Sequence, residues 1–226
     1  NTAMGTMLKY GSEGAKHFYE MFVLKPEHSE AHANGDIHIH DLDFYTLTTT
    51  CCQIDILKLF KNGFSTGHGT LREPNDITSY AALACIAIQS NQNDQHGGQS
   101  IVNFDYGLAP GVRKTFKKRY FRAMGDALEL IAGADPEAVT ALLKEKLEKQ
   151  DIIPALDESE DYNEAQMQVL LEAGYDHDDI IKAQHFAREK AEKGTDRATY
   201  QAMEALIHNL NTMHSRAGAQ TPFSSI

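Results

Sequence analysis

The sequence contains no tryptophan, only three cysteines, and fewer basic than acidic side chains. With 21 Lys and Arg against 32 Asp and Glu, the formal net charge is −11, which argues against a broad phosphate-binding surface for DNA or RNA. Small phosphorylated ligands are not excluded, because a pocket needs only local donors. No apolar run approaches the ~18 residues of a membrane span, and the first ten residues lack the pattern of a signal peptide. We therefore expect a cytoplasmic protein that binds neither nucleic acid nor membrane.

The cysteines are Cys51, Cys52 and Cys85. Their number is odd and two are adjacent, where a disulfide would be strained, so reduced cytoplasmic thiols fit best. Cys85 lies in an apolar stretch and is expected to be a small buried hydrophobe. On a strand, one thiol of the adjacent pair faces inward and the other outward. The pair is open to a structural role or to a redox or hydrogen-donor role.

Composition changes along the chain, from Gly, His, Thr and Asn in the first half to Ala, Glu, Lys and Leu in the second. The apolar pattern, with Pro and Gly at its boundaries, predicts seven helices. They cover residues 12–24, 26–33, 77–89, 110–132, 136–150, 162–173 and 178–214, the last with a potential interruption at Gly194. Extended segments are expected at 36–40, 46–56, 100–104 and 220–226, with a polar loop over 91–98. These elements predict a helix-rich α/β chain.

Histidines gather before the cysteine pair, at His28, His32, His38 and His40. On a strand, His38 and His40 would point to the same face about 7 Å apart. Such a pair can hold a divalent metal or donate hydrogen bonds to a phosphate or hydroxyl. The structural alternative is that these histidines lie at the end of a strand and have their hydrogen bonds satisfied within the protein. A metal-dependent hydrolase would need further ligands on later strands, and His208 falls in a predicted helix.

Three further features favour ligand contact without specifying it. Gly97-Gly98 allows close backbone approach or positive φ angles, although a plain turn explains it equally well. Polar residues around a Gly and a Pro at 215–225 would be costly in a core strand. A basic cluster could be a solvated face or a triphosphate-binding patch, and its members are Arg113, Lys114, Lys117, Lys118, Arg119 and Arg122.

Five segments, in order, resemble the anaerobic (class III) ribonucleotide reductase family. They are GDIHIHDLDFY (35–45), TTCCQIDI (49–56), NGFSTGHGTLREPNDITSY (62–80), QHGGQSIVNFDYGLAPGV (95–112) and NLNTMHSRAGAQTPFSSI (209–226). The stretch 115–195 matches only loosely. The resemblance implies that residues 1–226 are an incomplete amino-terminal portion of one catalytic domain, the first part of a ten-stranded glycyl-radical-enzyme barrel with long flanking helices. Its mostly helical part, 109–214, would begin with the dimer and effector region.

The resemblance also implies an enzyme, an oxidoreductase that converts ribonucleoside triphosphates to 2′-deoxyribonucleotides for DNA replication. In that family a radical S-adenosylmethionine activase installs a glycyl radical, a thiyl radical on a cysteine abstracts the ribose 3′ hydrogen, and formate is the usual reductant. The glycyl-radical loop, the thiyl cysteine, the four-cysteine zinc site and the ATP-cone have no match in this sequence. We therefore expect residues beyond both ends, and no turnover by this chain alone.

The family motifs assign roles to individual residues. Cys51 matches the second cysteine, which donates hydrogen from the opposite side of the ribose, and Cys52 is expected to face away. Residues expected to contact substrate are His38, His40, Ser224 and Ser225. Residues expected to contact ATP or deoxynucleotide effectors at a homodimer interface are Gln99, Lys114 and Lys118. No metal ligand is expected within this chain. The alternatives are the metal-dependent hydrolase and an isolated dimerisation and effector-binding module.

Overall fold

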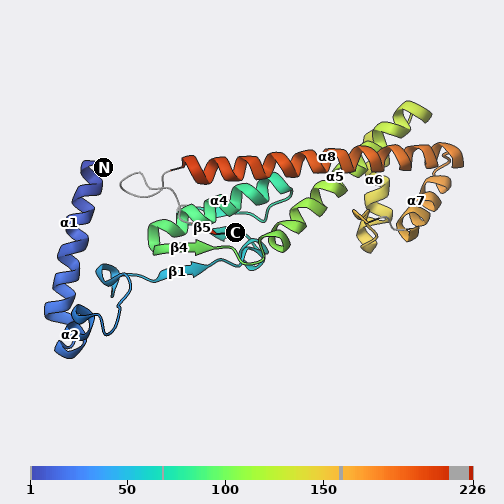
Figure 1. Cartoon of the computed structure of the whole chain (residues 1–226). Coiled ribbons are helices and arrows are strands. Elements are labelled where there is room, and N and C mark those ends of the chain that lie inside the picture. Colours follow the sequence, from blue (N-terminus) through green and yellow to red (C-terminus); the bar gives the residue numbers. More distant parts are fainter. Residues whose placement is uncertain (1, 68, 158–159, 214–223, 226) are drawn as a thin grey trace. The chain divides into compact units, whose positions relative to one another are not determined.

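The computed structural model describes residues 2–67, 69–157, 160–213 and 224–225 (Figure 1). Most of these residues are helical, and the predicted helix-rich α/β class is confirmed. The α-helices are α1 Ala3–Phe18, α2 Pro26–Asn34, α3 Ile56–Phe60, α4 Ile77–Asp94, α5 Phe104–Ala132, α6 Pro136–Lys146, α7 Glu160–Glu172 and α8 His177–Thr212. Shorter helical turns are η1 Tyr19–Val23, η2 Leu42–Phe44 and η3 Glu148–Gln150. The strands are β1 Thr50–Gln53, β2 Phe64–Ser65, β3 Thr70–Leu71, β4 His96–Ser100 and β5 Ser224–Ser225.

Local capping explains why α2 begins and ends close to the predicted bounds and why α6 begins where expected. Helix α6 ends at Lys146 rather than at 150, and the helix predicted from residue 12 begins at Ala3, where the Thr2 side chain caps α1. Pro26 occupies the first turn of α2, where its missing N–H has no partner to lose, and Gly35 ends the helix at φ 82°. Pro136 begins α6 in the same way, and the Asp135 side chain accepts from the backbone N–H of Glu137. These boundaries were predictable because single residues determine them.

Four of the predictions differ from the structure. Residues 36–40 form no strand, because the chain turns after Gly35 and reaches η2 through Asp41 at φ 49°. The expected loop over 91–98 is the end of α4 followed by β4, and the expected strand at 100–104 therefore ends at Ser100. Helix α8 continues through Gly194, where a Cβ atom would lie 2.7 Å from Nη1 of Arg119. That glycine makes room for a neighbouring side chain and does not interrupt the helix.

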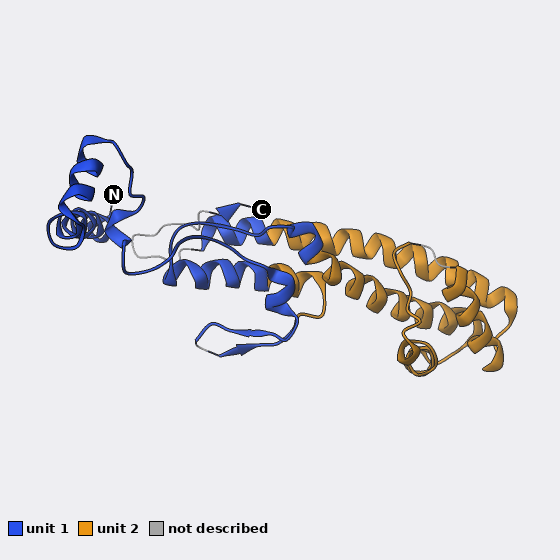
Figure 2. Cartoon of the chain, turned by 90° about the horizontal axis from the view of Figure 1, so that it is seen from below, with its two compact units in different colours: residues 1–73, 83–107, 206–226 blue, residues 74–82, 108–205 orange. Residues whose placement is uncertain are grey.

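The chain forms two compact units (Figure 2). Unit 1 comprises residues 1–73, 83–107 and 206–226, and unit 2 comprises residues 74–82 and 108–205. The sheet of unit 1 has the order β1-β4-β5 with both pairings parallel. The short antiparallel pair β2-β3 belongs to the same unit. Unit 1 therefore contains the segments with the histidines, the cysteine pair and the two glycines.

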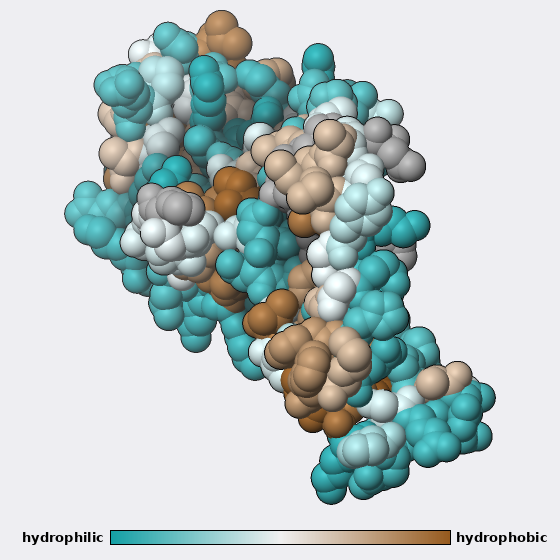
Figure 3. Space-filling view, turned by 90° about the vertical axis from the view of Figure 1, so that its left-hand side faces the viewer, coloured by the Kyte–Doolittle hydropathy of each residue, from teal (hydrophilic) through white to brown (hydrophobic). Residues whose placement is uncertain are grey.

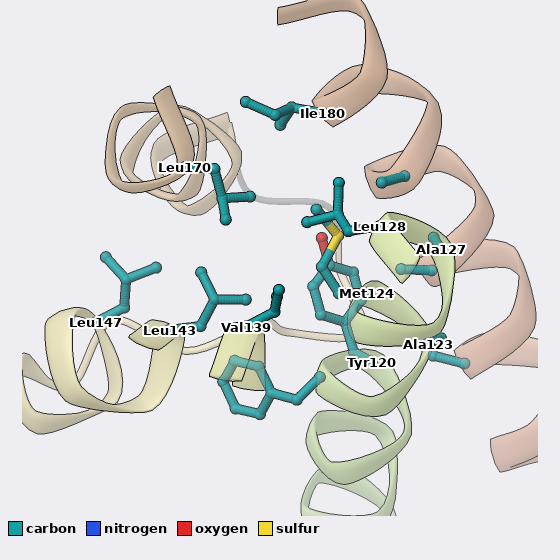
Figure 4. Close-up of a cluster of buried hydrophobic side chains, with 14 of the residues drawn as sticks. Tyr120, Ala123, Met124, Ala127, Leu128, Val139, Leu143, Leu147, Leu170 and Ile180 are labelled. Carbon is teal, nitrogen blue, oxygen red and sulfur yellow. The ribbon is translucent and has the colours of Figure 1, made fainter. Parts of the chain in front are cut away.

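Unit 2 is a helical body with its own core (Figure 4). Large side chains from α5, α6, α7 and α8 are fully buried there, among them Met124, Leu143, Leu170 and Ile180. A polar network lies within this core, where the hydroxyl of Tyr120 donates to Oε1 of Gln166 at 2.9 Å. Apolar burial of this extent is the main stabilising term for such a helical body.

The surface retains many large apolar side chains. Figure 3, viewed from the side of α1 in Figure 1, shows hydrophobic side chains lying among hydrophilic ones. Helix α1 buries none of its residues, and its exposed members include Met4, Met7, Leu8 and Phe18. Within the described residues, no helix is long and apolar enough to cross a membrane.

Candidate functional site

The candidate site is centred on an irregularity in the pairing of β1 with β4. Thr50 is paired with His96 and Cys52 with Gln99, so β4 has one more residue than β1 between the two pairs. A bulge of this kind changes the direction of a side chain, and bulges are frequent next to active sites. Cys51 lies in the bulge with φ 52°, a left-handed conformation that costs a non-glycine residue about 1–2 kcal/mol.

Gly97 allows the thiol of Cys51 to approach the backbone of β4. Gly97 has φ 95°, and a Cβ atom built on it would lie 2.9 Å from Sγ of Cys51 and 3.8 Å from Oδ2 of Asp41. The structure thus shows a positive φ angle and a close approach at Gly97, while contact of the two glycines with a ligand stays a prediction. The plain turn is wrong, because both glycines belong to β4.

The neighbouring thiol has different surroundings. The side-chain amide nitrogen of Asn91, on α4, lies 2.9 Å from Sγ of Cys52 and 2.8 Å from Oε1 of Gln99. Gln99 is 3% exposed, and its Nε2 atom has no hydrogen-bond partner in the described structure. Cys52 and Gln99 thus face α4, while Cys51 is exposed and lies against Gly97.

A carboxylate joins the histidine motif to this bulge. Oδ1 of Asp41 lies 3.4 Å from Nε2 of His96, and Oδ2 lies 3.3 Å from Nε2 of His40. The His38 ring is 5.9 Å from that of His40 and 5.7 Å from that of His32. His38 and His40 are therefore neighbours, but the strand that was expected to place them on one face is absent. Asp41 also links this motif to Cys51, because Oδ2 of Asp41 and Sγ of Cys51 both lie within 4 Å of the Cβ position of Gly97.

Several residues of this site were not predicted. His96 stacks on Phe44, with ring centroids 3.9 Å apart and planes 10° apart, and Asn91 bridges two strands through their side chains. The sequence offered one signal, since His96 directly precedes the two glycines. Asp41 follows His40 in the same motif and was given no role of its own.

The remaining predicted substrate contacts lie on the other side of β4. Ser224 pairs with Gln99 and Ser225 with Ser100, so β4 separates them from β1 and its cysteines. Strands are spaced by about 4.8 Å, which places β5 roughly 10 Å from β1. The neighbouring polar residues at 214–223 lie outside the described part of the chain.

Cys85 is separate from the site. It is 2% exposed on α4, and its Sγ lies 3.7 Å from the backbone oxygen of Leu206. Burial raises the pKa of the Cys85 thiol, an effect that a hydrogen bond with Asn209 partly offsets. Its burial agrees with the predicted role as a small hydrophobe, because a buried thiol with a raised pKa is a weak nucleophile.

The basic residues expected to bind effectors belong to unit 2. Nζ of Lys114 donates to the backbone oxygen of Pro74 at 3.0 Å and lies 5.4 Å from the ring centroid of Tyr80. Lys118 is exposed and lines a groove of about 890 Å³. Its basic residues are Lys117, Lys118, Arg122 and Lys144, and its acidic residues are Asp126, Asp135, Glu137 and Glu148. Nζ of Lys117 is already paired with Glu148 at 2.6 Å.

The metal-dependent hydrolase receives no support from the part of the chain that the structure describes. Within it, no group of three or more His, Cys, Asp or Glu side chains is arranged to hold a metal ion.

Comparison with known proteins gives a consistent result. A family model described as anaerobic ribonucleoside-triphosphate reductase matches residues 1–226. Curated relatives of that name from Enterobacteria phage T4, Salmonella typhimurium and Escherichia coli are each 31% identical over 106 residues. The matched part covers 46% of this chain and 17%, 15% and 15% of those relatives, less than a fifth of their length. Because the family model matches the whole chain, the protein belongs to the anaerobic ribonucleoside-triphosphate reductase family.

Proposed function

We propose that this chain is part of an enzyme that reduces ribonucleoside triphosphates to 2′-deoxyribonucleoside triphosphates, with the Cys51 thiol donating hydrogen to the ribose. One observation carries the assignment of Cys51. The thiol of Cys52 lies 2.9 Å from the Asn91 amide on α4, whereas Cys51 lies in the bulge beside Gly97 and is exposed. A hydrogen donor must reach its substrate, and of the two thiols Cys51 is the accessible one.

The proposed substrate lies across the sheet of unit 1. His38 and His40 approach the cysteine end of this surface through Asp41, and their ring nitrogens can donate hydrogen bonds to phosphate or hydroxyl oxygens. Ser224 and Ser225 lie on β5, two strand spacings from β1. A substrate placed across the three strands would contact both groups.

The overall reaction requires a two-electron reductant. In the proposed reaction formate is oxidised to carbon dioxide while the ribose 2′-hydroxyl leaves as water, so that formate and one proton balance the reduction. The glycyl radical, installed by a radical S-adenosylmethionine activase, supplies the unpaired electron that makes the ribose reactive. We propose that the radical glycine, the thiyl cysteine, the zinc site and the remaining strands of a ten-stranded barrel belong to a longer cytoplasmic polypeptide.

Regulation would involve the basic side of unit 2. We propose that a phosphate of ATP or of a deoxynucleotide effector contacts Lys118 in the groove, while Lys114 supports the same region through Pro74 and Tyr80. Gln99 belongs to unit 1, where it is buried and faces α4, and we assign it no contact in this groove. A homodimer formed through this region would couple effector binding to the choice of substrate.

The test compares two adjacent substitutions in the full-length enzyme. Cys51→Ala is expected to abolish deoxynucleotide formation and to leave the electron paramagnetic resonance signal of the glycyl radical intact. Cys52→Ala is the matched control and should retain most activity, because it removes only a thiol that faces α4. Equal turnover by Cys51→Ala and wild type would refute the assignment.

A further inference from the structure

The Asp41–His96 pair has no role in the function proposed above, although it lies beside Cys51. The Asp41 carboxylate lies between two imidazoles, with Oδ1 3.4 Å from His96 and Oδ2 3.3 Å from His40. The side chains of Asp41 and His96 are 16% and 27% exposed, whereas that of His40 is 69% exposed. The pair with His96 is therefore the sheltered one, where a charge interaction is screened least.

Two contacts determine the state of the His96 ring. Phe44 stacks on it at 3.9 Å and fixes the plane of the ring. Nε2 faces the carboxylate of Asp41, which favours the hydrogen on that nitrogen. In a neutral imidazole the other nitrogen, Nδ1, then carries a lone pair and accepts a hydrogen bond.

Nδ1 of His96 has no such hydrogen bond within the described residues, although the atom is buried. Buried polar atoms are nearly always satisfied, and leaving one unpaired costs about 1–3 kcal/mol. Because Nδ1 is an acceptor, its partner must be a hydrogen-bond donor. Because the Asp41 carboxylate lies nearby, an anionic partner is disfavoured and a neutral donor is favoured. The chemistry of the position therefore selects a hydroxyl group.

The position of this acceptor relates it to the reacting thiol. His96 directly precedes Gly97, and the Cβ position of Gly97 lies within 4 Å of both Sγ of Cys51 and Oδ2 of Asp41. An imidazole, a carboxylate and a thiol from three segments of the chain thus converge on one residue.

We infer that His96 is a further substrate-contacting residue, whose Nδ1 accepts a hydrogen bond from a ribose hydroxyl, and that Asp41 positions it. This inference rests on the proposed function, because it takes the ribose to lie beside Cys51. In this inference Asp41 acts through the imidazole of His96.

The first test measures the tautomer of His96 in the chain by long-range ¹H–¹⁵N nuclear magnetic resonance above pH 8. The Nε2-protonated tautomer is expected in wild type and in Asp41→Glu, which keeps the carboxylate. Asp41→Asn should give a mixture of tautomers. Asp43→Asn is the matched control, because that carboxylate accepts from Ser12 at 2.6 Å and should leave His96 unchanged. An Nδ1-protonated ring in wild type would overturn the inference, whether or not Asp41→Asn folds.

The second test adds CTP or 2′,3′-dideoxy-CTP to the full-length enzyme at the same concentration. CTP is expected to move the Nδ1 resonance of His96, and the dideoxy compound, which lacks both ribose hydroxyls, should not. No change with CTP, or an equal change with both, would overturn the inference. Failure of this inference can be told apart from failure of the proposed function. The proposed function fails when Cys51→Ala retains turnover, and it does not depend on the tautomer of His96.

Discussion

A Cβ atom on Gly97 would lie 2.9 Å from the sulfur of Cys51, closer than real Cβ contacts come. The absence of a side chain at position 97 therefore leaves room for the thiol of Cys51. This relationship connects β4 to the residue on which the proposed chemistry depends, and it can be tested by adding one methyl group.

Gly97→Ala should lower the free energy of unfolding more than a glycine substitution with the same backbone strain. Both Gly97 and Gly67 have positive φ angles, at 95° and 87°, but nothing lies within 4 Å of a Cβ atom on Gly67. Each alanine costs about 1–2 kcal/mol for the left-handed conformation, and the contact with Cys51 should add about 1–3 kcal/mol. Urea unfolding of the two variants measures the difference. Equal losses would show that the close approach to the thiol is not a constraint.

Gly125→Ala should separate α5 from the start of α6. A Cβ atom on Gly125 would lie 2.8 Å from the backbone oxygen of Pro136 and 3.0 Å from its Cα, and backbone atoms cannot rotate away. We expect a loss of about 1–3 kcal/mol, typical of overpacking. Gly14→Ala, in α1 with nothing within 4 Å, should instead stabilise its helix by about 0.5–1 kcal/mol. Thermal unfolding gives the midpoint temperature of each variant. Shifts of both midpoints in the same direction would contradict this prediction.

Leu143→Ala tests the core of unit 2. Leu143 is fully buried in the cluster of Figure 4, so its truncation leaves a cavity and should cost about 2–5 kcal/mol. Leu130→Ala on α5, at a side chain that is 81% exposed, should change stability by less than about 0.5 kcal/mol. Urea midpoints measure both changes, and a small effect at Leu143 would mean that the helices do not pack around it.

Unit 2 should lose stability at alkaline pH because of a buried tyrosine. Burial raises the pKa of Tyr162 far above its usual range, and Tyr120 and Glu148 add to the shift. A raised folded-state pKa contributes stability that is complete below the unfolded value of about 10 and is lost as pH rises above it. The free energy of unfolding should therefore fall from about pH 10 upward, by at most ~1.4 kcal/mol per pH unit for this group.

Tyr162→Phe should make this alkaline decline shallower, although it removes the acceptor for Nε2 of Gln166 at 3.3 Å and should cost about 1 kcal/mol at pH 8. Tyr200→Phe, at a side chain that is 73% exposed, is the control and should leave the decline unchanged. Urea unfolding at pH 8 and pH 11 gives the slopes, and identical slopes for Tyr162→Phe and wild type would contradict the prediction.

The sequence alone determined the features that depend on local chemistry. Pro26 and Gly35 delimit α2 because one restricts φ and the other tolerates a positive φ. The apolar run beginning at Ile77 predicted a buried helix because periodicity reports burial, and α4 begins there. The order of five motifs was sufficient for the family, which the match over residues 1–226 shows.

Tertiary structure decided which of these residues meet. Residues 91–94 look like a polar loop, but they continue α4, where Asn91 reaches Cys52 and Gln99 on two strands. The proximity of Asp41 and His96 arises because β1 pairs with β4 in parallel and brings distant segments together. Pattern and propensity describe neighbours along the chain, whereas the conformation of Cys51 and the orientation of its thiol depend on a partner strand more than forty residues away.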